Sequence, residues 1–461
     1  MSSAPPQSDP SRAPRLRASI LALAVPASLE AVFQMSFGFL DQVVIGHLGE
    51  APLAAVGLTS QLMFLSTLVL GGIAAGTAIL VAQFHGKGDS IGVTRSTGAS
   101  LLLAALVAVP LAVAVVAAPR RLLALLGTEA TVIDAGAGYF QLVMATLPLA
   151  LLGTVVVGAL RSLGDAKTPM FVTFGTMGAN TVLNVVLVFG LGPLPAFGLA
   201  GAAAATVASQ VLRLAVLAVL LARRREIDPA ALVRIATAER RMVRRLTELS
   251  LPIAGANGLW ALGAFVYTVT CVQLGTVAMV ANQLVLATEA IFIMFSSGFG
   301  VAALTLVGQS VGVGDFARVK TQTRALVRIG LQSAVFFGLL LAGAAFLVPV
   351  AYPEVSAETL RWVTLGLILN AFVQPAKVLN MILSNGVLRA AGDTRMLMLI
   401  DVVAIYGVGV PVALLLALPL ELGILGIFLG RAAEEVSRTL ILWLRYRTPS
   451  WQRVVVADSP A

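Results

Sequence analysis

Four polar side chains stand out because they lie inside long apolar stretches, where a carboxylate or an amide needs a partner or a function. Asp41 lies a few residues before the expected outer end of the first such stretch, and Glu30 precedes it by eleven residues. At ~100° and ~1.5 Å per residue, this spacing puts both carboxylates on one helical face, about 16 Å apart. Asn180 and Asn184 are spaced i and i+4 in a later stretch and project from one face.

These residue types suit the binding of a cation. A charge near the middle of a membrane helix costs roughly 2.5–3.5 kcal/mol on insertion scales, so an acid there is a functional candidate by default. Carboxylate and amide oxygens can coordinate Na⁺ or share a proton. Asp41, Asn180, Asn184 and Glu30 are therefore functional candidates, and H⁺ is favoured over Na⁺ as a ligand because oxygen ligands are few. The alternatives are an interfacial acid at Asp41, a structural partner for Glu30, and asparagines that hold helices together.

Polar residues of the later apolar stretches, together with Gln34 of the first, provide candidates for a substrate cleft. Glu289 and Asp401 are the obvious ionic partners of Lys377, since a buried lysine must be paired. Lys377 then serves either a structural ion pair or the tuning of proton affinity and cation release. The full set of cleft candidates is Gln34, Trp260, Glu289, Lys377, Asn380 and Asp401.

The composition indicates that the helices holding these residues lie in a membrane. The chain has 461 residues, of which 58% are hydrophobic and 11% charged, and its mean hydropathy is +0.95. Soluble domains carry about 25% charged residues, so a soluble enzyme and a disordered chain are excluded. The net charge of +9 is spread over short loops, which indicates membrane orientation and argues against nucleic-acid binding. One cysteine, Cys271, and two isolated histidines predict neither a disulfide framework nor a metal centre.

Apolar stretches long enough to cross a membrane recur along the chain, since a bilayer core of about 30 Å needs ~20 residues per helix. Twelve spans are expected: 18–46, 53–84, 95–118, 136–160, 168–190, 197–222, 249–273, 279–307, 325–350, 359–387, 396–417 and 421–445. Basic residues gather in the loops on the side of the amino terminus, so both termini are expected in the cytoplasm. Arg431, Glu434 and Glu435, nearer an inner end, are expected to reach the membrane surface or pair there.

The longest polar stretch divides the spans into two sets of six. We expect a cytoplasmic tail at 1–17, an N-terminal lobe at 18–222, a basic cytoplasmic linker at 223–248, a C-terminal lobe at 249–447 and a cytoplasmic tail at 448–461. The arginine-rich linker is expected to be amphipathic and to lie on the inner membrane surface, attracted to anionic lipid, and the alternative is a regulatory site.

The two sets of spans repeat each other in sequence. Three pairs match at an offset of 226 or 228 residues: Pro26 with Pro252, VAQFHGKGD at 81–89 with VGQSVGVGD at 307–315, and GALRSLGDAK at 158–167 with GVLRAAGDTR at 386–395. Because each half has an even number of spans, both halves enter the membrane from the same side. The fold class is therefore an all-α polytopic membrane protein with two six-helix bundles, related by a pseudo-twofold axis along the membrane normal and separated by a cavity.

The repeated segments also have structural interpretations. Glycines permit the tight turn of Gly-x-Leu-Arg-x-x-Gly-Asp, whose arginine is expected to contact headgroups or helix-end carbonyls and whose aspartate is expected to cap the next helix. Pro26 and Pro252 interrupt helix hydrogen bonding, so they are hinge candidates unless they merely shape static helices.

The sequence resembles the multidrug and toxic compound extrusion (MATE) family. The resemblance rests on PASLEAVFQMSFGFLDQVVIGHLG at 26–49, LAAVGL at 53–58, GANTVLNVVLVFG at 178–190 and the paired LRSLGDAKTP and LRAAGDTR turns. It implies efflux of amphipathic, often cationic compounds in exchange for H⁺ or Na⁺, by alternating access to a cleft between two lobes. Asp41 corresponds to the acidic residue of the first span that the family uses in cation coupling. If the first and fifth spans meet as in the family, the resemblance implies a cation-coupling site of Asp41, Asn180, Asn184 and Glu30.

Some positions depart from the family pattern. Certain branches carry an acid at the position of Asn184, and another branch carries acids near Trp260 and Val378. The C-terminal Na⁺ site of that branch is therefore not expected here, and Asp41 would couple the ion nearly alone, with Glu30. Trp260 cannot ligate a cation, but its ring can stack on a cationic compound.

Other function classes remain open from the sequence. A flippase for lipid-linked saccharides would favour more spans and a cationic cavity, while a channel would not need the repeat. An enzyme is not expected, because the spans lack HExxH and GxSxG. We expect a monomer of the bacterial cytoplasmic (inner) membrane that has no cofactor and contacts small organic molecules and lipid, but no nucleic acid.

Overall fold

The computed structural model describes residues 12–190, 195–229 and 240–456, which form helices and no strand. The long helices of the first half are α1 (Arg12–Gly46), α2 (Glu50–Lys87), α3 (Ser90–Ala117), α5 (Ala130–Met144), α6 (Leu147–Ser162), α7 (Lys167–Phe189) and α8 (Gly198–Ala222). Those of the second half are α10 (Arg240–Gln273), α11 (Thr276–Gly312), α12 (Phe316–Ala345), α14 (Ala357–Asn380), α15 (Thr394–Val402), α16 (Val410–Ala417) and α17 (Ile424–Arg447). The shorter segments are α4 (Pro119–Leu125), α13 (Val348–Ala351), the π-helical η1 (Met381–Leu388) and η2 (Val403–Gly409), and η3 (Pro449–Trp451).

Eleven helical segments of the described chain are long and apolar enough to cross a membrane. They correspond to the first eleven expected spans. The twelfth expected span forms α17, a helix of 24 residues that carries Arg431, Glu434, Glu435 and Arg438. Because such charges are costly against lipid, α17 needs polar partners inside the bundle.

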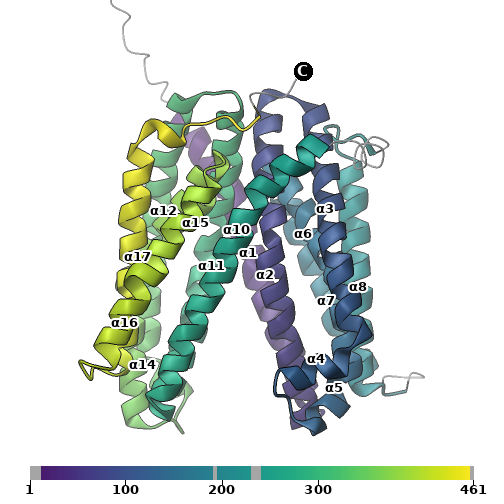
Figure 1. Cartoon of the computed structure of the whole chain (residues 1–461), viewed down its shortest axis with the longest axis vertical. Helices are drawn as coiled ribbons and strands as arrows, with labels where there is room; N and C mark the ends of the chain where they lie inside the picture. Colours follow the sequence, from purple (N-terminus) through teal and green to yellow (C-terminus); the bar gives the residue numbers. More distant parts are fainter. Residues whose placement is uncertain (1–11, 191–194, 230–239, 457–461) are drawn as a thin grey trace, which may run out of the picture.

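Two bundles of helices converge at one end of the molecule and diverge toward the other (Figure 1). The first bundle contains α2, α3, α5, α6, α7 and α8, and the second contains α11, α12, α14, α15, α16 and α17. Leu80 and Leu151 lie in the core of the first bundle, and Val307 and Leu326 lie in that of the second. The predicted all-helical, two-lobed fold is confirmed.

The first helix of each half exchanges lobes at the convergent end. Ile20 and Leu23 of α1 lie in the core of the second lobe, whereas Leu246 and Ile253 of α10 lie in the core of the first. Farther along, α1 packs against α7 of the first lobe and α10 against α15 of the second. The lobes are therefore interlocked at this end rather than divided cleanly at the predicted boundaries.

The basic linker is shorter than predicted. It was expected to reach residue 248, but α10 begins at Arg240, and residues 230–239 lie outside the described part of the chain. Met242 and Leu246 lie about one turn apart and are both buried. This apolar face makes the charged stretch an amphipathic first section of α10, so charge alone misplaced the start of the helix.

Glutamines of the repeated VxQxxGxGD motif join the two lobes at the convergent end. Gln83 Nε2 donates to the carbonyl oxygen of Ala390 at 2.7 Å, and Gln309 Nε2 donates to that of Ser162 at 3.0 Å. Each acceptor belongs to the Gly-x-Leu-Arg-x-x-Gly-Asp turn of the opposite lobe. The two contacts are reciprocal, as a pseudo-twofold axis requires.

The aspartates of these turns do not behave alike. Asp165 accepts a hydrogen bond from the backbone N–H of Thr168 at 2.9 Å and so caps α7, as predicted. Asp393 makes no capping hydrogen bond to α15 and binds Arg445 Nε at 2.7 Å instead. In the second lobe the aspartate therefore forms an ion pair with an arginine of α17 and does not make the predicted cap.

The segment after α17 crosses from the second lobe to the first (Figure 1). Gln83 Oε1 accepts hydrogen bonds from the backbone N–H groups of Val455 and Val456, at 2.9 and 3.3 Å. Lys87 Nζ donates to the carbonyl oxygen of Val456 at 2.6 Å. Residues 453–456, here called the C-terminal strap, therefore tie the second lobe to α2.

Candidate functional site

Asp41 on α1 contacts two asparagines of α7. Asn184 Nδ2 donates to Asp41 Oδ1 at 2.8 Å and to Asn180 Oδ1 at 3.3 Å. Asn184 is 1% exposed, and its own Oδ1 has no hydrogen-bond partner among the described residues. The i, i+4 spacing on α7 and the packing of α7 against α1 create this cluster. The structure thus places together three of the four residues predicted to bind the coupling cation.

Asp41 differs from the other acids in the interior of the spans because it lacks a basic partner. In the described ranges, each of the others forms an ion pair with arginine or lysine: Glu30, Glu289, Asp401, Glu434 and Glu435. The Asp41 carboxylate instead accepts a hydrogen bond from the neutral amide of Asn184. A carboxylate held in this way remains available to a proton or a metal cation.

The oxygens of this cluster suit a cation that binds and leaves. Asp41 offers a carboxylate, and Asn180 and Asn184 offer amide oxygens, which are the hard ligands that small hard cations prefer. Among the described residues, no group of three or more His, Cys, Asp or Glu side chains could hold a metal ion. Oxygen donors of this kind are ligands that H⁺ or Na⁺ can use, whereas transition metals favour imidazole and thiolate.

Glu30 lies in a separate network within the first lobe. Its Oε2 accepts a hydrogen bond from Arg161 Nη2 at 2.7 Å, its Oε1 accepts one from Thr173 Oγ1 at 3.0 Å, and it is 1% exposed. Arg161 is the arginine of the first Gly-x-Leu-Arg turn. Arg161 was expected to contact headgroups or helix-end carbonyls, but its guanidinium forms an ion pair with the buried carboxylate of Glu30. Arg161 is therefore the structural partner that was the alternative for Glu30.

Replacing Glu30 with glutamine is expected to destabilise the fold. The substitution leaves Arg161 without its ionic partner, and breaking a buried pair in this way costs about 3 kcal/mol. We expect a lower midpoint of thermal unfolding for the purified protein, whereas Glu50→Gln, at an exposed helix start, serves as a control without effect. An unchanged midpoint combined with lost transport would instead make Glu30 a coupling residue.

A cavity of about 510 Å³ opens mainly in the second lobe, with Phe64 and Leu68 of α2 contributing from the first lobe. Most of its wall comes from α10, α11, α14, α17 and the π-helical segments. Five of the six cleft candidates line it: Trp260, Glu289, Lys377, Asn380 and Asp401. The sixth, Gln34 on α1, is exposed and lies outside this lining.

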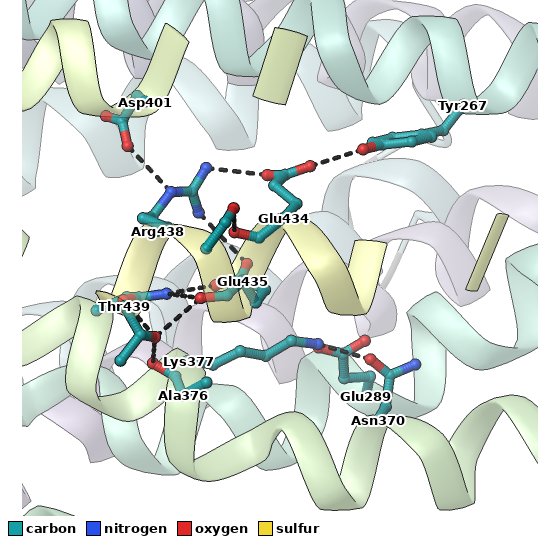
Figure 2. A network of polar contacts seen from close by, with 12 residues as sticks. Tyr267, Glu289, Asn370, Ala376, Lys377, Asp401, Glu434, Glu435, Arg438 and Thr439 are labelled. Carbon is teal, nitrogen blue, oxygen red and sulfur yellow. Dashed lines mark hydrogen bonds and ion pairs between the residues drawn. The ribbon is translucent and has the colours of Figure 1, made fainter. Parts of the chain in front are cut away.

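Two groups of ion pairs lie on the cavity wall (Figure 2). Lys377 Nζ contacts Glu289 and donates to Asn370 Oδ1 at 2.7 Å. Asp401, the other acid predicted to pair with Lys377, binds Arg438 Nε at 3.1 Å instead. Lys377 therefore joins α14 to α11, while Asp401 belongs to a group centred on α17.

Arg438 is the centre of the second group and was missed by the sequence analysis. Its guanidinium contacts Glu434 at 2.9 Å and Glu435 at 3.4 Å, in addition to Asp401. Glu434 is 6% exposed and accepts a hydrogen bond from the hydroxyl of Tyr267 at 2.8 Å. The expected membrane-surface position of Glu434 and Glu435 is therefore wrong. Their spacing from Arg438, which puts all these charges on one helical face, is the signal that could have indicated an inward-facing polar stripe.

The remaining predicted residues occupy distinct places. Asn380 Nδ2 donates to Glu435 Oε2 at 2.7 Å and so bridges α14 and α17. Trp260 is 44% exposed and lines the cavity, which leaves its ring accessible for stacking. Pro26 and Pro252 both lie inside continuous helices, α1 and α10, so their hinge role stays a prediction.

The sequence profile of the MatE family matches residues 26–186 and 252–415, one segment in each half of the chain. The chain belongs to the MatE family. MatE-family relatives include two proteins named "Probable multidrug resistance protein NorM". The one from Thermotoga maritima is 24% identical over 96% of this chain and 95% of the relative. The one from Bradyrhizobium diazoefficiens is 29% identical over 93% of this chain and 92% of the relative.

Solved MatE-family structures share the fold. The Vibrio cholerae MATE transporter VcmN in its bent form has a TM-score of 0.85 and 21% identity, and covers 97% of this chain and 99% of its own. An outward-facing multidrug resistance MATE family transporter has a TM-score of 0.84 and 20% identity, covering 95% and 97%. This chain is therefore a multi-pass membrane protein with the two-lobed MatE fold.

Proposed function

We propose that this MatE-family protein exports amphipathic organic compounds in exchange for a cation that binds at Asp41. The observation that carries the proposal is the carboxylate of Asp41, which Asn184 holds without a basic partner while the other interior acids are ion-paired. Export of organic compounds is supported by the names of relatives, which call them multidrug resistance proteins. H⁺ is the favoured coupling ion because the cluster offers few oxygen ligands.

The second-lobe cavity is the proposed substrate site. Its wall combines apolar side chains with four acids and four bases: Glu289, Asp401, Glu434, Glu435, Lys377, Arg389, Arg431 and Arg438. A flippase for saccharide pyrophosphates would favour a cationic majority in this place. The balanced lining supports a transporter of organic amphiphiles over that alternative.

Alternating access requires the contacts at the convergent end to break and reform. This end carries the basic turns and the C-terminal strap, so we place it in the cytoplasm of a bacterial inner membrane. The reciprocal Gln83 and Gln309 contacts then close the cytoplasmic side while the lobes diverge outward (Figure 1). Cation binding at Asp41 shifts the populations of the inward-open and outward-open states only if one of these states binds the cation more tightly than the other.

Deleting residues 453–461 is expected to raise the population with an open cytoplasmic side. The deletion removes the hydrogen bonds of the strap to Gln83 and Lys87, each worth about 0.5–1.5 kcal/mol net. The measurement is the electron-spin distance between labels on Lys167 and Arg395, exposed and equivalent positions of the two lobes, in a Cys271→Ala background.

The two interlobe glutamines provide a matched comparison for this deletion. Gln83→Leu removes both the interlobe donor and the strap acceptor, whereas Gln309→Leu removes the equivalent donor alone. We therefore expect the population with the longer label distance to be larger in Gln83→Leu than in Gln309→Leu. A deletion that leaves the distance distribution of the wild type unchanged would show that the strap does not stabilise the closed side.

The proposed exchange is tested by dye uptake into inverted membrane vesicles, with a pH gradient and a Na⁺ gradient imposed separately. Accumulation with one gradient and none without it identifies the coupling ion. Uptake that follows neither gradient, or a current that does not depend on a substrate, would contradict antiport and favour a flippase or a channel.

A further inference from the structure

The charged side chains of the second-lobe cavity do not neutralise one another evenly. The four acids of the lining make direct ion pairs with only two of its four bases: Glu289 with Lys377, and Asp401, Glu434 and Glu435 with Arg438. Arg389 and Arg431 line the same cavity and form no ion pair among the described residues. The cavity therefore presents two guanidinium groups that make no direct ion pair with a carboxylate of its lining.

Arg389 is the less satisfied of these two arginines. The guanidinium of Arg431 lies 5.4 Å from the ring centroid of Tyr267, and its Nη1 donates to Asn282 at 3.5 Å. The guanidinium of Arg389 makes no hydrogen bond among the described residues, and its Nε is buried without a partner. Asp401 is close enough to act on Arg389 electrostatically, but its contact is with Arg438. Arg161 and Arg438 also have a buried Nε without a hydrogen bond, but their other guanidinium nitrogens bind carboxylates, whereas those of Arg389 do not. Leaving a buried guanidinium without an acceptor is costly.

The internal repeat shows what Arg389 lacks. Its equivalent in the first lobe, 228 residues earlier, is Arg161, which binds the buried carboxylate of Glu30 at 2.7 Å. The residue 226 positions after Glu30 is Ala256, and Ala256 lines the same cavity as Arg389. The second lobe thus keeps the arginine of this pair and has a methyl group in place of its carboxylate.

We propose that Arg389 binds a carboxylate carried by the transported compound, in the space left where Ala256 replaces the acid. The substrate class is then an amphiphile with a carboxylate, including zwitterions, which deepens the proposed export function and rests on it. Arginine and carboxylate form paired, charge-assisted hydrogen bonds. Apolar side chains such as Phe64 and Ile293, together with the accessible ring of Trp260, contact the rest of the molecule.

The test compares two dyes that differ only at the carboxyl group. Rhodamine 110 carries a free carboxylate, and rhodamine 123 is its methyl ester. Their dissociation constants are measured by fluorescence anisotropy with the full chain in lipid nanodiscs, without any ion gradient. We expect rhodamine 110 to bind about tenfold or more tightly, because the ester cannot form the charged pair.

Three variants assign the preference to Arg389. Arg389→Gln is expected to bring the ratio of the two dissociation constants close to one. Ala256→Glu restores the carboxylate of the first lobe, fills the space beside Arg389 and should abolish the preference. Arg395→Gln removes an exposed arginine of the same turn and is expected to leave both constants unchanged.

Each outcome of this test decides between the inference and the proposed function. Binding of rhodamine 123 without a preference for rhodamine 110, or a preference that survives Arg389→Gln, overturns the inference and leaves export of organic compounds standing. A preference that disappears when chloride replaces isethionate, an anion without a carboxylate, assigns Arg389 to a small inorganic anion and also overturns it. Failure of both dyes to bind counts against the inference and the proposed function together.

Discussion

Replacing Asp41 with asparagine is expected to abolish gradient-driven export and to reduce drug resistance to that of cells without the transporter. Asparagine has nearly the same shape and can keep a hydrogen bond with Asn184, which lies 2.8 Å from the Asp41 carboxylate. It cannot carry the negative charge that binds a proton or Na⁺. The measurement is the minimum inhibitory concentration of cationic dyes, together with the amount of protein in the membrane.

The control for this variant is Asp134→Asn. Asp134 forms an exposed ion pair with Arg120 at 2.7 Å, and exposed pairs contribute little to stability. We expect resistance and expression like those of the wild type. Normal resistance in Asp41→Asn at equal expression would exclude Asp41 as the coupling residue, since an amide would then suffice.

Replacing Gly312 with alanine is expected to open the cytoplasmic side. A Cβ atom at this position would lie 2.1 Å from the carbonyl oxygen of Gln83, and the contact is with backbone, which cannot swing away. Overpacking of this kind costs about 1–3 kcal/mol, which corresponds to a population change of roughly 5- to 150-fold. The measurement is the distance between spin labels on Lys167 and Arg395, which we expect to lengthen.

The matched control is Gly71→Ala in α2. This substitution also replaces a helical glycine, but a Cβ atom there meets nothing within 4 Å. We expect the label distances of the wild type and, because alanine favours the helix, equal or higher stability. If Gly71→Ala and Gly312→Ala gave the same distance distribution, close packing of α2 against α11 would not govern the closed state.

The fold could be predicted from the sequence because hydrophobic length and the internal repeat are local signals. Twelve apolar stretches and the offset between Pro26 and Pro252 suffice for two bundles of parallel topology. The exchange of α1 and α10 between the lobe cores could not be predicted, since both helices are apolar on several faces and the sequence does not show which core each one joins. The C-terminal strap was missed because its contacts to α2 use backbone groups.

The part of the candidate site that depends on spacing along a single helix could be predicted from the sequence. Asn180 and Asn184 share a face of α7, and their contact with Asp41 requires only that α1 and α7 meet. Partners on different helices were harder to predict: Asp401 was matched to Lys377 and binds Arg438. The number of apolar residues on either side of a charged residue in the sequence indicates that its side chain is buried. Which side chain of opposite charge pairs with it depends on the packing of helices that are far apart in the sequence.

The coupling of cation to substrate through Asp41 is tested most directly with the purified protein in sealed liposomes that contain a pH-sensitive and a Na⁺-sensitive dye. An outward gradient of a transported compound should drive one of the two cations in the opposite direction in the wild type. Asp41→Asn should bind the compound but move neither cation. Equal cation movement in Asp41→Asn, or substrate export by the wild type without either cation, would contradict the mechanism proposed for this transporter.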